Sequence, residues 1–328
     1  MNHTVCVTGA TGFVGRAVVR ELLAAGHSVR ALVRDAAKAR SVLPTDAKLA
    51  LVTGNVLEPT TLGALTEGCD ACIHLVGIIR QSGRATFQRV HVEATANMLE
   101  ACTRAGIKRF IHMSAMGVRP DGRAEYQRTK FEGERLVRRS GLDWTVFRPG
   151  LIHGPDGEFV NMVRTMATGD VPPFFFIPYF TRMVEHDEGV IGARVSFEAA
   201  RVAPVYVKDV AQMFVAALRS PASVGEVYNL SGPEEMDFRK LMETLRDELP
   251  GTDVNLPVVG LPGTPHAWAA AAAGFVGLGS LLPFDQGQAF LAQEDTTADT
   301  RKAQQHLGFK PVPFVPTLKA YAPAMATH

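Results

Sequence analysis

The chain has 328 residues, of which 46% are hydrophobic and 20% are charged, and this composition is typical of a soluble globular protein. The formal net charge of +1 gives no electrostatic basis for binding nucleic acid. The length fits one large α/β domain with an appendage, or two domains. Because the first predicted strand begins within a few residues of Met1, we expect no signal or transit peptide and a cytoplasmic location.

A glycine-rich segment near the start of the chain is the strongest signal. An apolar run at residues 5–7 leads into Thr8-Gly9-Ala10-Thr11-Gly12-Phe13-Val14-Gly15, and an amphipathic run at residues 17–23 follows. In this context Gly9 permits a sharp turn, Gly12 the close approach of a pyrophosphate, and Gly15 tight packing of the helix on the strand. The N–H groups at the helix start then face the phosphates. We therefore predict a dinucleotide site, and not a turn without a ligand, with contacts from Gly9, Thr11, Gly12, Phe13, Val14 and Gly15.

The rest of the first half alternates predicted strands and helices. Further strands are expected at residues 28–33, 49–53, 71–76, 109–113 and 144–147, and helices at residues 87–105 and 125–140. Strands without simple alternation, separated by helices, indicate a parallel sheet covered on both faces. With right-handed crossovers this is an α/β fold with a doubly wound parallel sheet, the Rossmann arrangement.

The second half is less regular. Residues 171–180 are apolar and interrupted by prolines, and residues 185–201 predict a hairpin or flap. A strand at 204–207, a helix at 208–219 and a strand at 226–230 follow, and the last hundred residues predict helices and loops. We therefore expect a Rossmann domain of residues 1–155 plus 204–231 and a smaller, interleaved C-terminal lobe of residues 156–203 plus 232–328, which would bind a substrate or a partner.

Two apolar segments of this lobe have open interpretations. Residues 174–180 fit a substrate pocket, the core of the lobe or a partner surface equally well. Residues 266–282 are rich in alanine and glycine, but they are short for a membrane span and lie between Pro265 and Pro283. We interpret them as a buried or interfacial helix, which leaves contact with a membrane surface open without a span.

The end of the second strand is expected to select the cofactor. Arg34 falls where the 2′-phosphate of NADP(H) would lie, and a guanidinium binds phosphate with two hydrogen bonds. Lys38 is one helical turn further on. We therefore prefer NADP(H), with NAD(H) as the alternative if Asp35 makes the selection. Asn55 and Val56 are predicted to flank the adenine, and the ribose and pyrophosphate are predicted to lie beside Leu75, Val76 and Gly77.

A candidate acid/base pair lies on the predicted helix at 125–140. Tyr126 and Lys130 are four residues apart and so share one helix face. A free phenol has a pKa of about 10, and we expect the neighbouring ammonium to lower the pKa of Tyr126. The lysine is also in position to hold the nicotinamide ribose. This pair, placed after the fifth strand of a Rossmann half, predicts proton transfer beside the nicotinamide.

The cysteines and histidines do not predict a metal site. Cys69 and Cys72 form a CxxC pair at a predicted strand, while Cys6 and Cys102 fall in another strand and in a helix. No further ligands lie near the pair in the sequence, so we interpret all four cysteines as ordinary core residues. His74 and His112 also fall in predicted buried strands, without converging carboxylates or cysteines.

These motifs resemble the short-chain dehydrogenase/reductase superfamily, in its extended or atypical branch. The resemblance rests on TGATGFVG, on the YxxxK of Tyr126 and Lys130, and on Arg148-Pro149-Gly150. Residues 87–93, 126–134, 141–145 and 204–210 are similar to one subgroup, which contains the nucleotide-binding accessory subunit of respiratory complex I and its stand-alone bacterial relatives. The similarity runs from the N-terminus to about Leu230.

The resemblance implies roles for single residues. Tyr126 matches the acid/base of the superfamily and Lys130 its ribose-binding lysine, and the cofactor contacts extend to Pro149 and Ile152. Ser114 is the candidate for polarising a substrate carbonyl, although extended members carry this hydroxyl one or two positions later, so we expect Ser114 to face the wrong way. His91 stands where extended members often carry asparagine.

The function expected from this reading is hydride transfer between NADP(H) and a carbonyl or alcohol substrate. A sugar-nucleotide epimerase or dehydratase is the nearest enzymatic alternative, but it would need a polar nucleotide pocket, and residues 174–180 are apolar. A non-catalytic module is the alternative from another class. Such a module would hold NADPH permanently and bind a protein complex in place of a small-molecule substrate.

Overall fold

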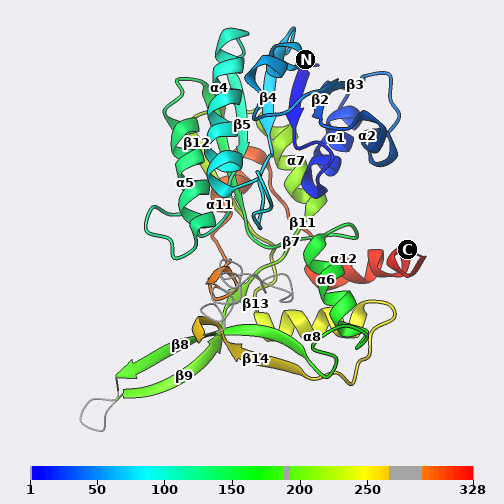
Figure 1. The fold of residues 1–328 in the computed structure, drawn as a ribbon, viewed down its shortest axis with the longest axis vertical. Helices are drawn as coiled ribbons and strands as arrows, with labels where there is room; N and C mark the ends of the chain where they lie inside the picture. Colours follow the sequence, from blue (N-terminus) through cyan, green and yellow to red (C-terminus); the bar gives the residue numbers. More distant parts are fainter. Residues whose placement is uncertain (1, 188–192, 266–289, 328) are drawn as a thin grey trace. The chain divides into compact units, whose positions relative to one another are not determined.

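The computed structural model describes residues 2–187, 193–265 and 290–327, and the chain divides into two compact units (Figure 1). The first unit comprises residues 1–150, 205–231 and 298–311. The second comprises residues 151–204, 232–297 and 312–328. Residues 298–311 thus group with the first unit, whereas the sequence places them in the second lobe. The predicted helix at 266–282 lies outside the described residues.

The first unit is built on a parallel sheet of seven strands. Their spatial order is β12-β6-β5-β4-β1-β2-β3, and each neighbouring pair is parallel. This order, in which the chain reverses direction across the sheet at β1, confirms the doubly wound Rossmann fold. The strands are β1 (Thr4–Thr8), β2 (Ser28–Val33), β3 (Leu49–Thr53), β4 (Ala71–His74), β5 (Arg109–Met113), β6 (Asp143–Pro149) and β12 (Glu226–Leu230). The predicted strand at 71–76 therefore ends two residues early.

Helices cover both faces of this sheet. Helices α1 and α7 pack together, and α3, α4 and α5 form a second packed group (Figure 1). The helix predicted at 87–105 begins as a π-helix, Gln88–Glu93, and continues as α4. The helices are α1 (Phe13–Ala24), α2 (Ala36–Val42), α3 (Leu62–Thr66), α4 (Ala94–Arg104), α5 (Glu125–Arg138), α7 (Val207–Ala217) and α11 (Arg301–Leu307), with short 3-10 turns at Pro59–Thr61 and Pro221–Ser223.

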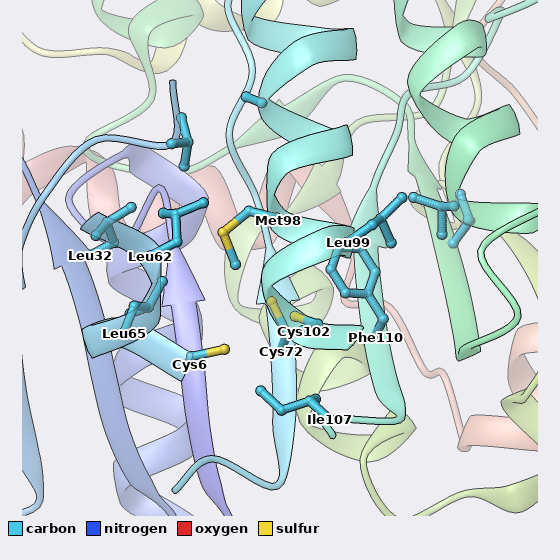
Figure 2. Packing of buried hydrophobic residues seen from close by; sticks show 14 residues of the cluster. Cys6, Leu32, Leu62, Leu65, Cys72, Met98, Leu99, Cys102, Ile107 and Phe110 are labelled. Carbon is cyan, nitrogen blue, oxygen red and sulfur yellow. The ribbon is translucent and has the colours of Figure 1, made fainter. Parts of the chain in front are cut away.

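A row of buried side chains on neighbouring strands forms the core under α4. Cys6, Cys72 and Phe110 are register partners on β1, β4 and β5, and Met98 and Leu99 of α4 lie above them (Figure 2). Side chains two residues apart on a strand share a face of the sheet. The next row on this face, toward the carboxyl ends of the strands, is therefore Thr8, His74 and His112. The core thus places polar groups at the edge where ligands of doubly wound sheets bind.

The second unit contains a three-stranded sheet in the order β14-β8-β9. Strands β8 (Ile177–Asp187) and β9 (Ala193–Ala199) form an antiparallel hairpin, and β14 (Val258–Pro262) pairs parallel with β8 (Figure 1). The expectation of only helices and loops in the last hundred residues is wrong for β14, since this short strand depends on a partner about eighty residues earlier. Other elements of this unit are α6 (Glu158–Ala167), α8 (Phe238–Glu248), α12 (Phe314–Tyr321), a 3-10 turn at Ala322–Thr327, and the two-residue strands β7 (Ile152–His153), β10 (Arg201–Val202) and β13 (Met236–Asp237). The two-residue strand β11 (Val205–Tyr206) belongs to the first unit.

The apolar segment at 174–180 divides between surface and core. Phe174 and Phe175 are 47% and 79% exposed, whereas Ile177 and Phe180 in β8 are buried. Among the residues that the structure describes, no helix is both long enough and apolar enough to cross a membrane.

Candidate functional site

The glycine-rich turn joins β1 to α1 with little free space around two of its three glycines. Gly9 has a φ of +75°, and a Cβ on Gly15 would lie 2.0 Å from the carbonyl oxygen of Gly9. The protein itself therefore requires glycine at both positions. Gly12 differs, because it is exposed and a Cβ there would lie 3.3 Å from the same oxygen. Packing excludes a side chain at Gly12 much less strictly, so the open space beside it is available to a ligand.

The first turn of α1 has backbone N–H groups that no side chain caps within the described part of the chain. Gly12 is the N-cap of the helix, and no acidic residue among those described lies in its first turn. The N–H groups of a helix start attract anions through their partial positive charge. Together with the open side of Gly12, this arrangement fits the pyrophosphate of a dinucleotide. Thr11, Phe13 and Val14 line the same turn, and the carbonyl of Thr11 accepts a hydrogen bond from Arg16.

The carboxyl ends of β2 and β3 carry the residues predicted to bind the adenosine half. Asp35 is the N-cap of α2, and its carboxylate accepts hydrogen bonds from the backbone N–H of Ala37 (2.9 Å) and Lys38 (3.0 Å). Arg34 and the side chain of Lys38 are exposed. The Asp35 carboxylate is thus used within the protein, whereas the Arg34 guanidinium lies open to solvent.

Asn55 and Val56 shape the loop after β3. The side-chain oxygen of Asn55 accepts from the N–H of Leu57 at 3.1 Å, an Asx turn that fixes the loop. Val56 is 9% exposed and belongs to the core, while its carbonyl accepts from Asn97 at 2.9 Å. Their contact with adenine stays a prediction.

Gly77 and Lys130 lie next to each other, although they come from separate motifs. A Cβ on Gly77 would lie 2.9 Å from Nζ of Lys130, and Gly77 itself is exposed. Leu75 is buried beside the turn at Gly9, while Val76 is half-buried. The structure therefore joins the glycine-rich turn, the end of β4 and the lysine of α5 at one edge of the sheet.

The remaining predicted cofactor contacts, Pro149 and Ile152, fall in different units. Pro149 ends β6 in the first unit, where its carbonyl accepts from the N–H of Met116 at 3.0 Å. Ile152 begins β7 in the second unit. Their contacts with the cofactor stay predictions.

Burial determines the charge of the Tyr126 and Lys130 pair on α5. Lys130 is 3% exposed, its ammonium donates to the carbonyl of Met113 at 2.8 Å, and burial lowers its pKa to about 8. Burial also raises the pKa of Tyr126 to about 12. The expectation that Lys130 lowers the pKa of Tyr126 is therefore wrong, because desolvation of the phenol dominates and the ammonium is directed to a backbone carbonyl.

Three histidines surround Lys130, and two of them, His74 and His112, are predicted from the sequence only as residues of buried strands. His74 shares a hydrogen bond with Thr8 (Nδ1 to Oγ1, 2.7 Å) and stacks on His112, with ring centroids 5.5 Å apart. His91 Nδ1 lies 2.9 Å from Thr129 Oγ1, and its ring meets the Tyr126 ring edge-on at 5.4 Å.

These histidines are neutral at physiological pH. Burial, and secondly the charge of Lys130, lower the pKa of His74 and of His91 to about 3, and the same two causes lower the pKa of His112 well below its usual range. The sequence could have indicated two of these histidines by their position. His74 and His112 are the last residues of β4 and β5 whose side chains point inward.

Two buried side chains at this place, one of them from the histidine cluster itself, lack hydrogen-bond partners within the described part of the chain. Among residues 2–187, 193–265 and 290–327, neither ring nitrogen of His112 nor Oγ of Ser114 has a hydrogen-bond partner. The N–H of Ser114 donates to the carbonyl of Phe147 at 2.7 Å, which continues the β5 ladder by one residue. Strand alternation then places the Ser114 side chain on the face of His112. Because unpaired buried polar atoms are costly, they mark a place where water, cofactor or substrate would bind. The catalytic role of Ser114 stays a prediction.

A buried ion pair fixes α5 against the sheet. Glu134 is fully buried, and both of its oxygens accept from Arg148 of β6, at 2.8 and 2.7 Å. This bidentate geometry is specific for arginine. Glu134 lies one turn beyond Lys130, so the ion pair holds the lysine and the tyrosine in register with the ends of β5 and β6.

Comparison with known proteins agrees with this geometry. A sequence profile of the NAD(P)H-binding family matches residues 9–171. The chain is 30% identical, over 92% of its length and 90% of the relative, to the 4-hydroxy-2-methyl-3-oxo-4-farnesyl-3,4-dihydroquinoline-1-oxide ketoreductase of Stigmatella aurantiaca. It is 32% identical to the ceramide reductase of Caulobacter vibrioides over 66% of this chain, a match that spans 61% of that protein.

Other relatives belong to a respiratory complex or share only the fold. The mitochondrial NADH-ubiquinone oxidoreductase 40 kDa subunit of Neurospora crassa is 24% identical over 75% of this chain and 60% of its own. A short-chain dehydrogenase/reductase superfamily protein from Agrobacterium tumefaciens, solved with bound NAD, aligns over 99% of this chain and 97% of its own with a TM-score of 0.65 and 22% identity. The chain belongs to the NAD(P)H-binding family, and it shares its fold with a short-chain dehydrogenase/reductase superfamily protein.

Proposed function

We propose that the protein is an NADP(H)-dependent oxidoreductase in which Tyr126 transfers the proton and Lys130 holds the nicotinamide ribose. The observation that carries the proposal is the placement of the buried Lys130 ammonium against the backbone of Gly77, one helical turn from Tyr126. Bound NADPH would supply the hydride. The residues of this chain bind the dinucleotide, orient the substrate carbonyl and provide the proton.

The pKa values favour the reductive direction. With a pKa of about 12, the Tyr126 phenol stays protonated at neutral pH and can donate its proton to the oxygen of a carbonyl that receives a hydride. Oxidation of an alcohol would require Tyr126 as a phenolate base, a form that burial disfavours. We therefore expect carbonyl reduction to be faster than alcohol oxidation near neutral pH.

The choice of NADP(H) over NAD(H) rests on Arg34 and Asp35. A carboxylate at the end of β2 selects NAD(H) by accepting from the ribose hydroxyls. The Asp35 carboxylate already accepts two backbone hydrogen bonds, while the exposed Arg34 guanidinium is available to a 2′-phosphate. Both features favour the cofactor that carries the extra phosphate.

The experiment is a screen for NADPH oxidation with carbonyl substrates. Ceramide and the farnesyl quinoline named for two relatives both carry long apolar chains, so ketones on long apolar chains come first. Turnover that vanishes in Tyr126→Phe while NADPH still binds supports the proposal. A ketone that is reduced equally well by Tyr126→Phe would contradict the role of Tyr126.

A second function, a non-catalytic module that keeps NADPH bound within a protein complex, is favoured by other observations. Tyr126 is half-buried and desolvation raises its pKa to about 12, so it does not ionise near neutral pH, and the Lys130 ammonium donates to the carbonyl of Met113. Relatives include a subunit of NADH-ubiquinone oxidoreductase and a photosystem II assembly factor. Cofactor exchange separates the two functions, because an enzyme must release its oxidised cofactor. NADPH that co-purifies and does not exchange with labelled NADPH supports the module.

A further inference from the structure

Three of the four cysteines of the chain converge in the first unit. The sulfurs of Cys6, Cys72 and Cys102 lie within 4.8 Å of one another, and Figure 2 shows Cys6 directed toward the other two. These residues come from β1, β4 and the last turn of α4, which are far apart in the sequence. The fourth cysteine, Cys69, precedes β4 and lies outside this group, with its thiol donating to the carbonyl of Leu65. We propose that the sulfurs of Cys6, Cys72 and Cys102 form a binding site for Zn²⁺.

The geometry is close to that of a tetrahedral thiolate site. A Zn–S bond of about 2.3 Å at the tetrahedral angle separates neighbouring sulfurs by about 3.8 Å. The observed upper limit of 4.8 Å therefore requires shifts of roughly 1 Å or less, which side-chain torsions can supply.

A positively charged side chain lies beside the sulfurs. Cys6 and Arg30 are register partners on neighbouring strands and so share one face of the sheet.

Arg30 supplies the charge balance that a buried thiolate site needs. Its Nε is buried and has no hydrogen-bond partner among the residues that the structure describes, while its guanidinium donates to the carbonyl of Ala64 in α3. Zn²⁺ with three thiolates carries one net negative charge, which one guanidinium offsets. A monovalent ion such as Cu⁺ with the same ligands would leave a further negative charge in an apolar core. The charges therefore favour a divalent thiophilic cation.

Cys69 differs from the three proposed ligands in its exposure. Cys6, Cys72 and Cys102 are fully buried, whereas Cys69 is half-buried at the surface and its thiol donates to the carbonyl of Leu65 at 3.3 Å. The site lies on the strand that leads into the glycine-rich turn, but its ligands are separate from every residue proposed to contact the dinucleotide.

The test uses the reduced, full-length protein, stripped of metal with a chelator and titrated anaerobically with Co²⁺ as a spectroscopic substitute for zinc. We expect thiolate-to-cobalt charge-transfer bands that saturate at one equivalent per chain and disappear on addition of Zn²⁺. Cys102→Ala should weaken binding at least tenfold, because one ligand is lost. Met98→Leu is the matched control, since it removes a sulfur from the same helix and core but not from the cluster.

The wild-type titration decides the proposal even if Cys102→Ala does not fold. Absence of thiolate bands in the folded wild-type protein would overturn it, as would bands that persist in Cys102→Ala. Binding of Cu⁺ without binding of Co²⁺ or Zn²⁺ would overturn the charge argument and the proposal with it. Loss of two free thiols in the freshly purified protein, without metal, would show a disulfide in place of the site.

Discussion

Tyr126 and Lys130 show how removal from water changes the acid–base chemistry of single residues. Removal from water disfavours the charged form of each group, so the pKa of the phenol rises to about 12 and that of the ammonium falls to about 8. At neutral pH the pair is therefore a neutral phenol beside an ammonium. This combination holds a proton ready for donation, and it differs from the phenolate that the spacing of the two residues suggests.

The first residue-level prediction concerns Tyr126→Phe. The change removes one hydroxyl and little volume, so folding and NADPH affinity should be retained. Loss of general acid catalysis typically lowers the rate about a hundred- to ten-thousandfold. Steady-state kinetics of any carbonyl reduction found in the screen would measure this loss.

Ser114→Ala is the companion to that variant. If the Ser114 side chain faces away from the substrate carbonyl, as its place in the sequence suggests, the turnover of Ser114→Ala should hardly differ from that of the wild type. An equal loss in both variants would show that the buried Ser114 hydroxyl does polarise the carbonyl, which its place on the face of His112 permits.

Arg34→Ala tests the choice of cofactor. A charge-assisted bidentate hydrogen bond to phosphate contributes about 1.5–3 kcal/mol, so the preference for NADPH over NADH should fall tenfold or more. Calorimetric titration of both cofactors gives the ratio directly. Lys38→Ala is the matched comparison one turn along α2, and an unchanged ratio in Arg34→Ala would exclude the guanidinium as the selector.

Among the secondary-structure elements, the glycine-rich turn contains one glycine that folding requires, Gly15, and one that ligand binding is expected to require, Gly12. Gly15→Ala would place a Cβ 2.0 Å from the carbonyl of Gly9, so we expect a loss of about 1–3 kcal/mol or more in the free energy of unfolding. Gly12→Val should leave the protein folded but block the approach of the pyrophosphate. Urea denaturation and NADPH titration of both variants would test this contrast. Normal NADPH affinity in a folded Gly12→Val protein would refute the dinucleotide assignment.

The elements that sequence patterns predict best are those whose partners are local. Strands β2, β3, β5 and β12 have the predicted bounds, because each is a compact apolar run between turns. β14 is missed because a five-residue strand is fixed by β8, its distant partner, and not by its own pattern. The hairpin predicted at 185–201 begins earlier, at Ile177, because the apolar run at 174–180 is itself half strand.

For the whole molecule, sequence motifs predict part of the candidate site, and the order of the strands in the sheet brings the other residues to it. The glycines, Tyr126 and Lys130 belong to motifs with fixed spacing, so the sequence identifies them. His74, His91 and His112 surround Lys130 only because β4, β5 and the turn before α4 end at the same edge of the sheet. Cys6 and Cys72, in the row of the sheet below, meet Cys102 of α4 for the same reason. No local pattern could reveal either cluster.

The buried histidines give the folded molecule a pH dependence with a definite sign. His74 and His91 have pKa values of about 3 in the folded chain, against 6.5 for a free histidine. Between these values the unfolded chain binds a proton at each histidine and the folded chain does not, so the free energy of unfolding rises with pH. Stability should therefore be complete above pH 6.5 and fall progressively toward pH 3.

Urea denaturation at pH 7 and pH 5 would measure this effect. Each of the two histidines should contribute a loss of about 2 kcal/mol at pH 5, since the pKa of the unfolded form lies about 1.5 units above that pH. His74→Gln keeps a hydrogen-bonding group beside Thr8 but cannot titrate, so its loss between the two pH values should be smaller by about 2 kcal/mol. Phe110→Leu, a change in the neighbouring core that adds no titrating group, should lower stability equally at both pH values. If His74→Gln loses as much stability on acidification as the wild type, then His74 is charged in the folded protein, and the neutral histidine cluster around Lys130 is wrong.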